Sequence, residues 1–419
     1  MMKKLLCLSN GHGEDVIAVR ILEQLQRHPK APEIAALPLV GKGHAYINLD
    51  IPIVGPVQQM PSGGFIYMDG KQLWQDLQGG LFRLTLAQYK VVRSWAKSGG
   101  QILAVGDIVP LLFAWLSGAD YSFVGTAKSD YYLRDETGWL PQTSTLERWF
   151  GSVYLPWERM LMSNRRCKAV FPRDTLTTDI LLNWSIPAVD LGNPMMDGIV
   201  PNLTVERTAD NQETLVILLL PGSRLPEAER NWEKIVRAIA ATMTTLSHRL
   251  VFIGAIAPNC DLAPFETYLL SQGWQRQPLN SVSNPIGDTQ ALAFTLNGAT
   301  VLLTQDAYAD ALLQADLAIA MAGTATEQFV GLGKPAIAMP GDGPQFTFAF
   351  AEAQTRLLGI SVILVANPTE VGTAIQSLLN DPDELHLIAQ NGRRRMGKKG
   401  AATRIASHLA TLDLDKIGL

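Results

Sequence analysis

Cysteine is scarce in this chain, and its few cysteines are widely spaced. The 419 residues include only Cys7, Cys167 and Cys260. An odd number at wide spacing argues against a disulfide-stapled secreted protein and favours reduced thiols in the cytoplasm. No group of histidine, cysteine and acidic residues has the spacing of a metal site in the sequence, so we expect a chemistry without a metal or other cofactor.

Charge and long apolar runs are also in short supply. Charged residues make up 18% of the chain, and the net charge of −4 gives no basic footprint for nucleic acid. No apolar stretch approaches the roughly 18 residues of a membrane-spanning helix. The first apolar run, Leu5 to Leu8, is shorter than the roughly 7–15 residues of a signal-peptide core, so we interpret it as a strand. We expect a cytoplasmic protein, with peripheral attachment to the inner face of a membrane as an alternative.

The sequence does have strand-like runs that alternate with helical patterns from end to end. In the first half the predicted strands are 4–9, 34–39, 102–105, 121–124, 169–171 and 189–191. In the second half they are 215–220, 250–253, 300–303, 317–321, 336–339 and 361–365. Strands separated by helices predict parallel sheets with both faces covered. Because 419 residues exceed one ordinary core, we predict two doubly wound, Rossmann-like α/β domains.

A polar stretch without hydrophobic period, residues 197–214, marks the boundary between the two series. We predict an N-terminal domain over residues 1–198 and a second domain over 199–400. Residues 401–419 are expected to form a C-terminal helix that packs back toward the first domain.

The richest stretch runs from Ala320 to Pro340. An apolar run stops at Gly323, a short amphipathic segment follows, and Lys334-Pro335 lead into the next apolar run. A helix that begins directly after a strand directs its backbone N–H groups and positive dipole end above the sheet. Such a site suits a nucleotide diphosphate. The residues that we assign to it are Gly323, Thr324, Ala325 and Thr326, with Glu327 or Gln328 as acceptor for the ribose hydroxyls.

A second turn follows the strand at 215–220. Gly222 permits close approach of the backbone, Ser223 can donate a hydrogen bond, and Arg224 can bind phosphate in a bidentate way. In a doubly wound sheet this turn and the one at Gly323 belong to the same edge. Gln345, in a glycine- and proline-rich loop after the strand at 336–339, is a candidate for the sugar or a simple helix cap.

Two further candidates lie in the first half. The loop after the first strand carries Gly11 and Gly13, but it is not the G-x-G-x-x-G of a nicotinamide site. His12 in that loop is one candidate general base. Asp107 is the other, because it follows an apolar strand, where burial raises a carboxyl pKa; the alternative for Asp107 is a helix N-cap.

Taken in order, these motifs resemble the GT-B glycosyltransferases, and most closely the lipid-A-disaccharide synthase family. The resemblance rests on six segments: Gly11-His12-Gly13-Glu14-Asp15; Asp107 with Pro110; Leu155-Pro156-Trp157-Glu158; Gly192 to Asp197; Leu219 to Arg224 with Glu227; and Gly323 to Thr326 before Gly333-Lys334-Pro335. The chain departs from the family at Gln328, where the ribose-binding Glu would fall. The segment from Val57 to Gln88 has no counterpart.

The resemblance implies two domains facing a central cleft, the first binding an acceptor and the second a UDP-sugar. It implies an inverting, metal-independent transferase that acts on a lipid acceptor, with Asp107 or His12 as the base. The implied nucleotide-sugar site comprises Gly11, Gly13, Gly222, Ser223, Arg224, Gly323, Thr324, Ala325, Thr326, Glu327, Gln328 and Gln345. The glycine- and aromatic-rich segment from Met60 to Phe82 is either an apolar lip for the lipid or a packed loop.

Two other functions fit the same pattern. A UDP-sugar 2-epimerase shares the two-domain fold, but it needs several acids and a histidine around the sugar, and no such cluster is obvious in the sequence. A non-catalytic protein that binds a nucleotide-sugar is the third hypothesis.

Overall fold

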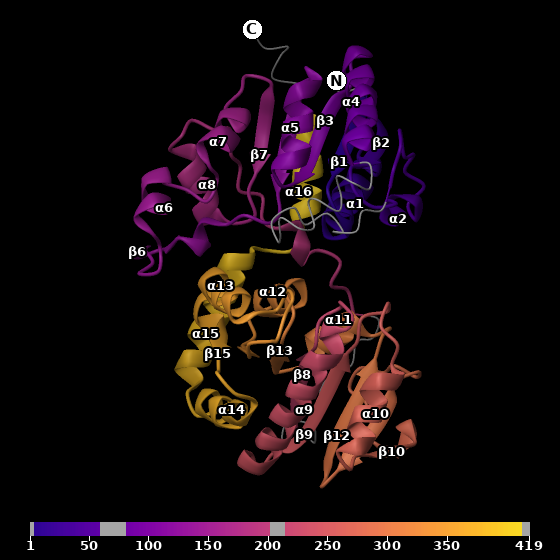
Figure 1. Cartoon of the computed structure of the whole chain (residues 1–419), viewed down its shortest axis with the longest axis vertical. Coiled ribbons are helices and arrows are strands. Elements are labelled where there is room, and N and C mark those ends of the chain that lie inside the picture. The colour runs from indigo at the N-terminus through magenta and orange to yellow at the C-terminus, as the bar shows by residue number, and fades with distance from the viewer. Residues whose placement is uncertain (1–3, 59–80, 202–213, 413–419) are drawn as a thin grey trace. The chain divides into compact units, whose positions relative to one another are not determined.

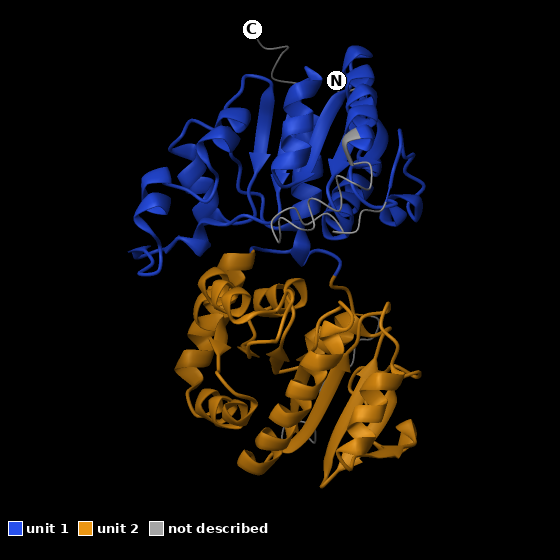
Figure 2. Ribbon diagram, viewed as in Figure 1, with its two compact units in different colours: residues 1–198, 397–419 blue, residues 199–396 orange. Residues whose placement is uncertain are grey.

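The computed structural model describes residues 4–58, 81–201 and 214–412, which form two compact units. Unit 1 comprises residues 1–198 with 397–419, and unit 2 comprises residues 199–396 (Figure 2). Each unit has its own sheet with helices packed against it (Figure 1). The α/β class with two doubly wound sheets, predicted from the alternating pattern, is confirmed.

Unit 1 is built on a five-stranded sheet in the order β2-β1-β3-β4-β7, and all its pairings are parallel. The strands are nearly continuous apolar runs because helices cover both faces of the sheet. Their bounds are β1 (Lys4–Ser9), β2 (Glu33–Pro38), β3 (Gln101–Gly106), β4 (Tyr121–Gly125) and β7 (Cys167–Phe171).

The helices of unit 1 cover the two faces of this sheet. One face carries α1 (His12–Gln26) and α16 (Ala401–Thr411), and the other carries α4 (Leu81–Lys97) and α5 (Ile108–Ser117) (Figure 1). The remaining α-helices in the described part of unit 1 are α2 (His44–Ile47), α6 (Thr145–Phe150), α7 (Pro156–Met162) and α8 (Thr175–Leu182).

The C-terminal helix α16 belongs to unit 1 although the chain reaches it through unit 2. The carboxylate of Asp197 accepts hydrogen bonds from the backbone N–H groups of Gly400 and Ala402, at 2.5 and 2.6 Å. The ring of His408 packs edge-on against Phe171 of β7, with 5.5 Å between centroids. An acid at a helix N-terminus thus fixes the returning segment, and the apolar stripe of α16 completes one face of the unit 1 core.

Unit 2 has an eight-stranded sheet in the order β10-β11-β12-β9-β8-β13-β14-β15. The six strands from β12 to β15 in this order pair in parallel, whereas β10 and β11 are antiparallel. The strands are β8 (Thr214–Leu220), β9 (Arg249–Ala255), β10 (Gln275–Gln277), β11 (Leu292–Leu296), β12 (Ala299–Thr304), β13 (Leu317–Ala320), β14 (Ala336–Ala338) and β15 (Val362–Leu364). The helices are α9 (Glu227–Thr245), α10 (Ala263–Ser271), α11 (Tyr308–Gln314), α12 (Thr324–Gly331), α13 (Phe348–Leu358), α14 (Val371–Leu379) and α15 (Pro382–Met396).

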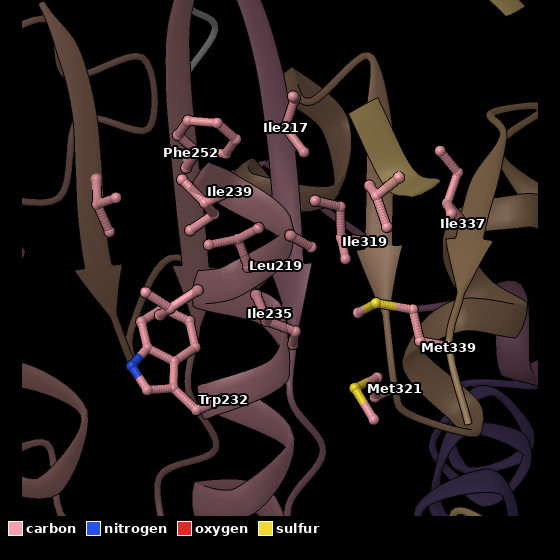
Figure 3. Packing of buried hydrophobic residues seen from close by; sticks show 14 of the residues in the cluster. Ile217, Leu219, Trp232, Ile235, Ile239, Phe252, Ile319, Met321, Ile337 and Met339 are labelled. Atoms are coloured by element: carbon pink, nitrogen blue, oxygen red, sulfur yellow. The ribbon is translucent and has the colours of Figure 1, made fainter. Parts of the chain in front are cut away.

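The core of unit 2 extends to the carboxyl ends of its central strands (Figure 3). Trp232, Ile235 and Ile239 recur along one face of α9 and pack on the apolar side chains of β8 and β9. Met321 and Met339, which follow β13 and β14 directly, are each only 1% exposed. The turns that begin at these positions therefore rest on a packed base.

One predicted strand is wrong. Residues 189–191 form no strand; the only pairing nearby is an isolated bridge between Val170 and Ala188. The reason is local, because the Asp190 carboxylate accepts a hydrogen bond from the N–H of Gly192 at 3.2 Å and turns the chain.

The antiparallel edge of unit 2 was missed, although β11 and β12 are joined by Asn297-Gly298 with φ of 47° and 83°. That dipeptide is a recognisable hairpin signal. The segment from Met60 to Phe82, proposed above as a lip, lies almost wholly outside the described residues. No described helix has the length and apolar character needed to cross a membrane.

Candidate functional site

The two glycine turns of unit 2 lie at the point where its strand order reverses. The chain leaves β8 toward β9 on one side, and β13 pairs with β8 on the other, with Leu220 opposite Ala320. The turn Pro221 to Arg224 follows β8, and Gly323 follows β13. In doubly wound sheets the crevice outside such a switch point is where ligands bind. The structure therefore brings together the two segments that the sequence analysis assigned to one site.

The two turns use glycine for different reasons. Gly222 has a φ of 97°, and a Cβ added there would lie 3.3 Å from the carbonyl oxygen of Met321, so the fold itself favours glycine. Gly323 has a φ of −82°, and its added Cβ would meet only Phe350, at an ordinary 3.5 Å. Nothing in the described chain requires glycine at 323. The missing side chain leaves the start of α12 open to an approaching group.

The start of α12 has no side-chain cap. Glu327 makes the first helical bond, to the carbonyl of Gly323 at 3.2 Å, and the N–H groups of Thr324, Ala325 and Thr326 have no acceptor among the described residues. Free N–H groups and the positive helix end form a ready site for an anion. The hydroxyl of Thr326 is buried and donates to the carbonyl of Ala322 at 2.6 Å, so what this residue offers to a ligand is its backbone.

Gln354 of α13 fixes the turn before α12 and was not found from the sequence. Its Nε2 donates to the carbonyls of Ala322 and Gly323, at 3.1 and 3.3 Å. Gln354 is 3% exposed, and its buried Oε1 has no hydrogen-bond partner in the described structure. The contact joins residues some 30 positions apart, which no local pattern indicates.

Asn231, one turn into α9, connects the two glycine turns. Its Nδ2 donates to the carbonyl of Pro221 at 3.0 Å and lies 3.5 Å from that of Met321. The side chain is 2% exposed. Because one buried amide holds the exits of both β8 and β13, the spacing of the two turns is fixed by the fold before any ligand arrives.

The same helix fixes a third loop, residues 340–347. The Glu227 carboxylate accepts the backbone N–H groups of Gln345 and Phe346, with shortest distances of 3.1 and 2.5 Å. Arg230 donates to the carbonyl of Gly343, and Lys234 to that of Pro340. Residues spaced three or four apart on one face of α9 therefore order the loop that carries Gln345. In the sequence Glu227 belongs to the family motif and to a predicted helix start, and neither feature indicates this contact.

The other predicted residues of this site differ in what they offer. Gln328 is buried, and its Oε1 accepts a 2.7 Å hydrogen bond from Tyr308, whereas Glu327 is half-buried in the first turn of α12. The half-buried Gln345 side chain has no polar partner in the described part of the chain. Arg224 is exposed. Partial desolvation lowers the pKa of its guanidinium, and the negative charge of Glu227 opposes that shift. Ser223 and Thr324 are exposed.

A second candidate site lies in unit 1, again at a switch point. The chain leaves β1 for β2 on one side, and β3 pairs with β1 on the other. Asn10 follows β1, Asp107 follows β3, and the Nδ2 of Asn10 lies 3.3 and 3.2 Å from the two carboxylate oxygens of Asp107. Asp107 also accepts the N–H of Val109 at 2.8 Å and so caps α5. The cap interpretation of Asp107 is confirmed, and its role as a general base stays a prediction.

Three carboxyl groups gather at this edge. Burial raises the pKa of Asp107, against the hydrogen bonds from Val109 and Asn10 and the nearby Lys128. Burial raises the pKa of Glu14 to about 7, with repulsion from Asp107 and Asp15 adding to the shift. Burial also raises the pKa of Asp15, to about 6, although the Ser9 hydroxyl donates to it at 2.6 Å. Of the three, Glu14 and Asp15 therefore exchange protons near neutral pH.

Asn10 and Glu14 were not singled out as site residues. The buried Oδ1 of Asn10 has no hydrogen-bond partner in the described structure, and Asn10 is 4% exposed. Glu14 crosses the end of β3, because a Cβ added to Gly106 would lie 3.1 Å from its Cγ. Glu14 lies in the first turn of α1, where an acid favours the helix dipole, and this local reason gives no sign of the tertiary contact.

His12 and its flanking glycines begin α1. His12 is exposed and forms no hydrogen bond or ion pair with the described chain, while Gly11 is buried with a φ of 141°. Space for a Cβ at Gly13 is open. An electrostatic influence of His12 lowers the pKa of Asp15.

The Leu155-Pro156-Trp157-Glu158 segment contributes an ion pair that acts on Asp107. Glu158 is 1% exposed, receives two hydrogen bonds from the Lys128 ammonium at 2.8 and 2.6 Å, and caps the start of α7. Lys128 lowers the pKa of Asp107 and Glu158 raises it. Removing either Lys128 or Glu158 would therefore change the electrostatic environment, and with it the pKa, of Asp107.

No family model matches the sequence, and no curated protein does either. Solved structures match over nearly the whole chain. A putative UDP-N-acetylglucosamine 2-epimerase from Listeria monocytogenes has 13% identity and a TM-score of 0.58, over 99% of this chain and 98% of the other. MurG from Acinetobacter baumannii has 15% identity and a TM-score of 0.55, over 97% and 99%.

The calicheamicin glycosyltransferase CalG4 is similar at 12% identity and a TM-score of 0.60, over 98% of both chains. At these identities the likeness concerns the fold alone. The two doubly wound units, the two switch points and the extent of the match together show that this chain has the GT-B fold.

Proposed function

We propose that this protein is an inverting, metal-independent glycosyltransferase that moves a sugar from a UDP-sugar to a lipid acceptor. One observation carries the donor half of the proposal: the turn Pro221 to Arg224 and the uncapped start of α12 lie side by side at the switch point of unit 2. Free backbone N–H groups and a helix N-terminus suit a diphosphate. The similar structures include MurG, the calicheamicin glycosyltransferase CalG4 and an epimerase bound to UDP-GlcNAc.

In this proposal unit 2 binds the donor. The N–H groups of residues 324–326 and the Arg224 guanidinium bind the diphosphate. Glu327 accepts hydrogen bonds from the ribose hydroxyls, since the Oε1 of Gln328 already bonds Tyr308. The Gln345 side chain lies on the loop that Glu227 orders and is assigned to the sugar.

Unit 1 is assigned to the acceptor and the base. Asp107 takes the proton of the acceptor hydroxyl, and the acceptor oxygen attacks C1 of the sugar. The bond from C1 to the diphosphate oxygen breaks, and UDP leaves with its electron pair; a single displacement of this kind inverts the configuration at C1. A carboxylate with a raised pKa is the stronger base. His12 is the alternative base, since it is exposed at the start of α1.

The lipid acceptor rests on the likeness of the motifs to lipid-A-disaccharide synthases, which run in the same order through both units. The proposal accordingly places the protein in the cytoplasm, at the inner face of a membrane.

A UDP-sugar 2-epimerase is the second candidate, and one observation favours it. Asp107, Glu14 and Asp15 gather with His12 at one edge of unit 1, which the sequence alone did not reveal. Removal and return of a proton on the sugar needs acids and a histidine of this kind. Proteins described as UDP-GlcNAc 2-epimerases share the fold.

Transfer is tested with labelled UDP-sugars and a membrane lipid extract, following label into the lipid phase. Asp107→Asn keeps the cap of α5, since Asn and Asp are equally good caps, but removes the base. We expect transfer to fall by about 10²–10⁴-fold with UDP affinity unchanged. Asp381→Asn, the same change at the exposed residue whose carboxylate accepts the Glu384 N–H, is the control and should leave transfer intact.

Other outcomes contradict the proposal. Interconversion of free UDP-GlcNAc without any acceptor would identify an epimerase. UDP binding with no turnover of any UDP-sugar and lipid pool would identify a binding protein, the third hypothesis.

A further inference from the structure

Helix α6 of unit 1 presents large apolar side chains to solvent. Leu146 and Trp149, three residues apart, are 61% and 76% exposed. No residue of α6 is buried, yet the helix is well formed, with a capping box between Ser144 and Glu147 and Gly151 at its C-cap. Its apolar face therefore contributes nothing to the described core. A helix held by its caps that exposes Leu and Trp is suited to contact something else.

Helix α7 adds a second pair of the same kind. Trp157 and Met160, again three residues apart, are 51% and 60% exposed. The two helices are joined, because Arg159 of α7 donates to the carbonyl of Phe150 in α6 at 2.7 Å; its guanidinium also stacks on the ring of Trp184, which follows α8, at 3.8 Å. Helix α7 lies beside β7 at one end of the unit 1 sheet, and α6 lies farther out on the same side of the unit (Figure 1). We call Leu146, Trp149, Trp157 and Met160 the apolar surface of α6 and α7.

The chain around this surface is basic in a protein that is acidic overall. Residues 144–168 contain five Arg and Lys residues and two Glu residues, whereas the whole chain has a net charge of −4. Glu158 is buried and pairs with Lys128 outside this segment, while Lys168 pairs with Asp120 outside it and Arg159 is buried. Arg148 and Arg165 flank the exposed apolar residues. Tryptophan beside arginine is the composition favoured at the headgroup level of a bilayer.

We propose that the apolar surface of α6 and α7 docks this protein on a bilayer that contains anionic lipid. The contact is peripheral: Trp149, Leu146, Trp157 and Met160 enter the headgroup boundary, and the nearby arginines meet lipid phosphates. The inference deepens the proposed function, because a lipid acceptor would be met at such a surface. Its test does not depend on turnover.

Vesicle flotation of the full-length protein tests the proposal, with vesicles of phosphatidylcholine alone or mixed with phosphatidylglycerol. We expect binding to the mixed vesicles, weakened by salt, and at least tenfold less binding to the neutral ones. Trp149→Glu should lower binding by about tenfold or more, since one buried aromatic side chain alone accounts for that factor. The control is Leu387→Glu in α15 of unit 2, which alters a side chain of similar exposure, 55%, and should bind as the wild type does.

Met160→Glu on the second helix guards against a local folding defect in the first variant, and circular dichroism with UDP binding reports the fold of each. The proposal is overturned if the wild-type protein ignores both vesicles, or if Trp149→Glu and Met160→Glu both bind them like the wild type. Self-association that Trp149→Glu abolishes, with no vesicle binding, would show instead that the surface joins two copies of the chain. None of these outcomes alters the UDP-binding result on which the proposed function rests.

Discussion

Glu14 offers a quantitative test of the electrostatics at the carboxyl edge of unit 1. Burial raises its pKa from 4.5 to about 7, so the folded protein holds a proton there that the unfolded chain releases. The stability supplied by the protonated carboxyl is complete below pH 4.5 and is lost as the pH rises through 7. With 1.36 kcal/mol for each pKa unit, the loss amounts to about 3 kcal/mol.

Glu14→Gln removes the ionisation while keeping the size of the side chain. We expect the variant to match the wild type near pH 4.5 and to exceed its free energy of unfolding by up to about 3 kcal/mol at pH 8. The assay is urea unfolding followed by tryptophan fluorescence at several pH values between 4.5 and 8. Ionised Asp107 and Asp15 repel Glu14, so the gain also contains their relief.

Glu23→Gln on the same helix is the matched control. Glu23 pairs with the exposed Arg27 at 2.6 Å, an i,i+4 contact worth about 0.3–0.5 kcal/mol. Glu23→Gln should lower the free energy of unfolding by that small amount, and its difference from the wild type should not grow in favour of the variant between pH 5 and 8. Equal pH profiles of Glu14→Gln and the wild type would refute the inference that the half-buried Glu14 lies beside other carboxyl groups.

Three further predictions concern unit 2. Asn231→Ala should lower the free energy of unfolding in urea by about 1–3 kcal/mol, because the carbonyl of Pro221 loses its buried donor. It should also weaken UDP binding in calorimetry, and full UDP affinity would contradict the role of Asn231 in connecting the two glycine turns. Gly341→Ala should cost about 1–3 kcal/mol, because its Cβ would lie 2.3 Å from the carbonyl oxygen of Phe346, and an unchanged melting temperature would disprove that packing. Thr326→Val should leave UDP affinity within about threefold, because the hydroxyl bonds Ala322; a larger loss would mean that the hydroxyl contacts the ligand.

The sheets could be predicted because their strands are buried on both faces. β1, β4 and β8 are short apolar runs bounded by turn residues, and such runs carry their structure in local composition. The turns at Gly222 and Gly323 follow directly from where these runs stop. Chain order then suggested that both turns belong to one edge, and the strand order of unit 2 agrees.

The contacts that complete the two edges could not be predicted in this way. Asn10 meets Asp107 across 97 positions, and Glu227 meets Gln345 across 118. Composition and periodicity describe neighbours along the chain, whereas these pairs depend on strand order and on the rotation of each helix. Glu14 and Glu227 each had a sufficient local explanation at a helix start, so nothing in the sequence prompted a search for a distant partner.

The central claim is that the uncapped start of α12 binds the diphosphate of UDP, and Gly323→Asp tests it most directly. The fold has room for the side chain, and Asp is a favoured N-cap, so α12 should be as stable as in the wild type or more so. The new carboxylate would occupy the N–H groups and repel the diphosphate.

Titration calorimetry with UDP, and with UMP for comparison, decides the matter. The account predicts that the wild type binds UDP more tightly than UMP. It further predicts that Gly323→Asp loses at least about tenfold in UDP affinity at an unchanged or higher melting temperature, since a like charge replaces an open anion site. Wild-type UDP affinity in a folded Gly323→Asp variant would contradict it.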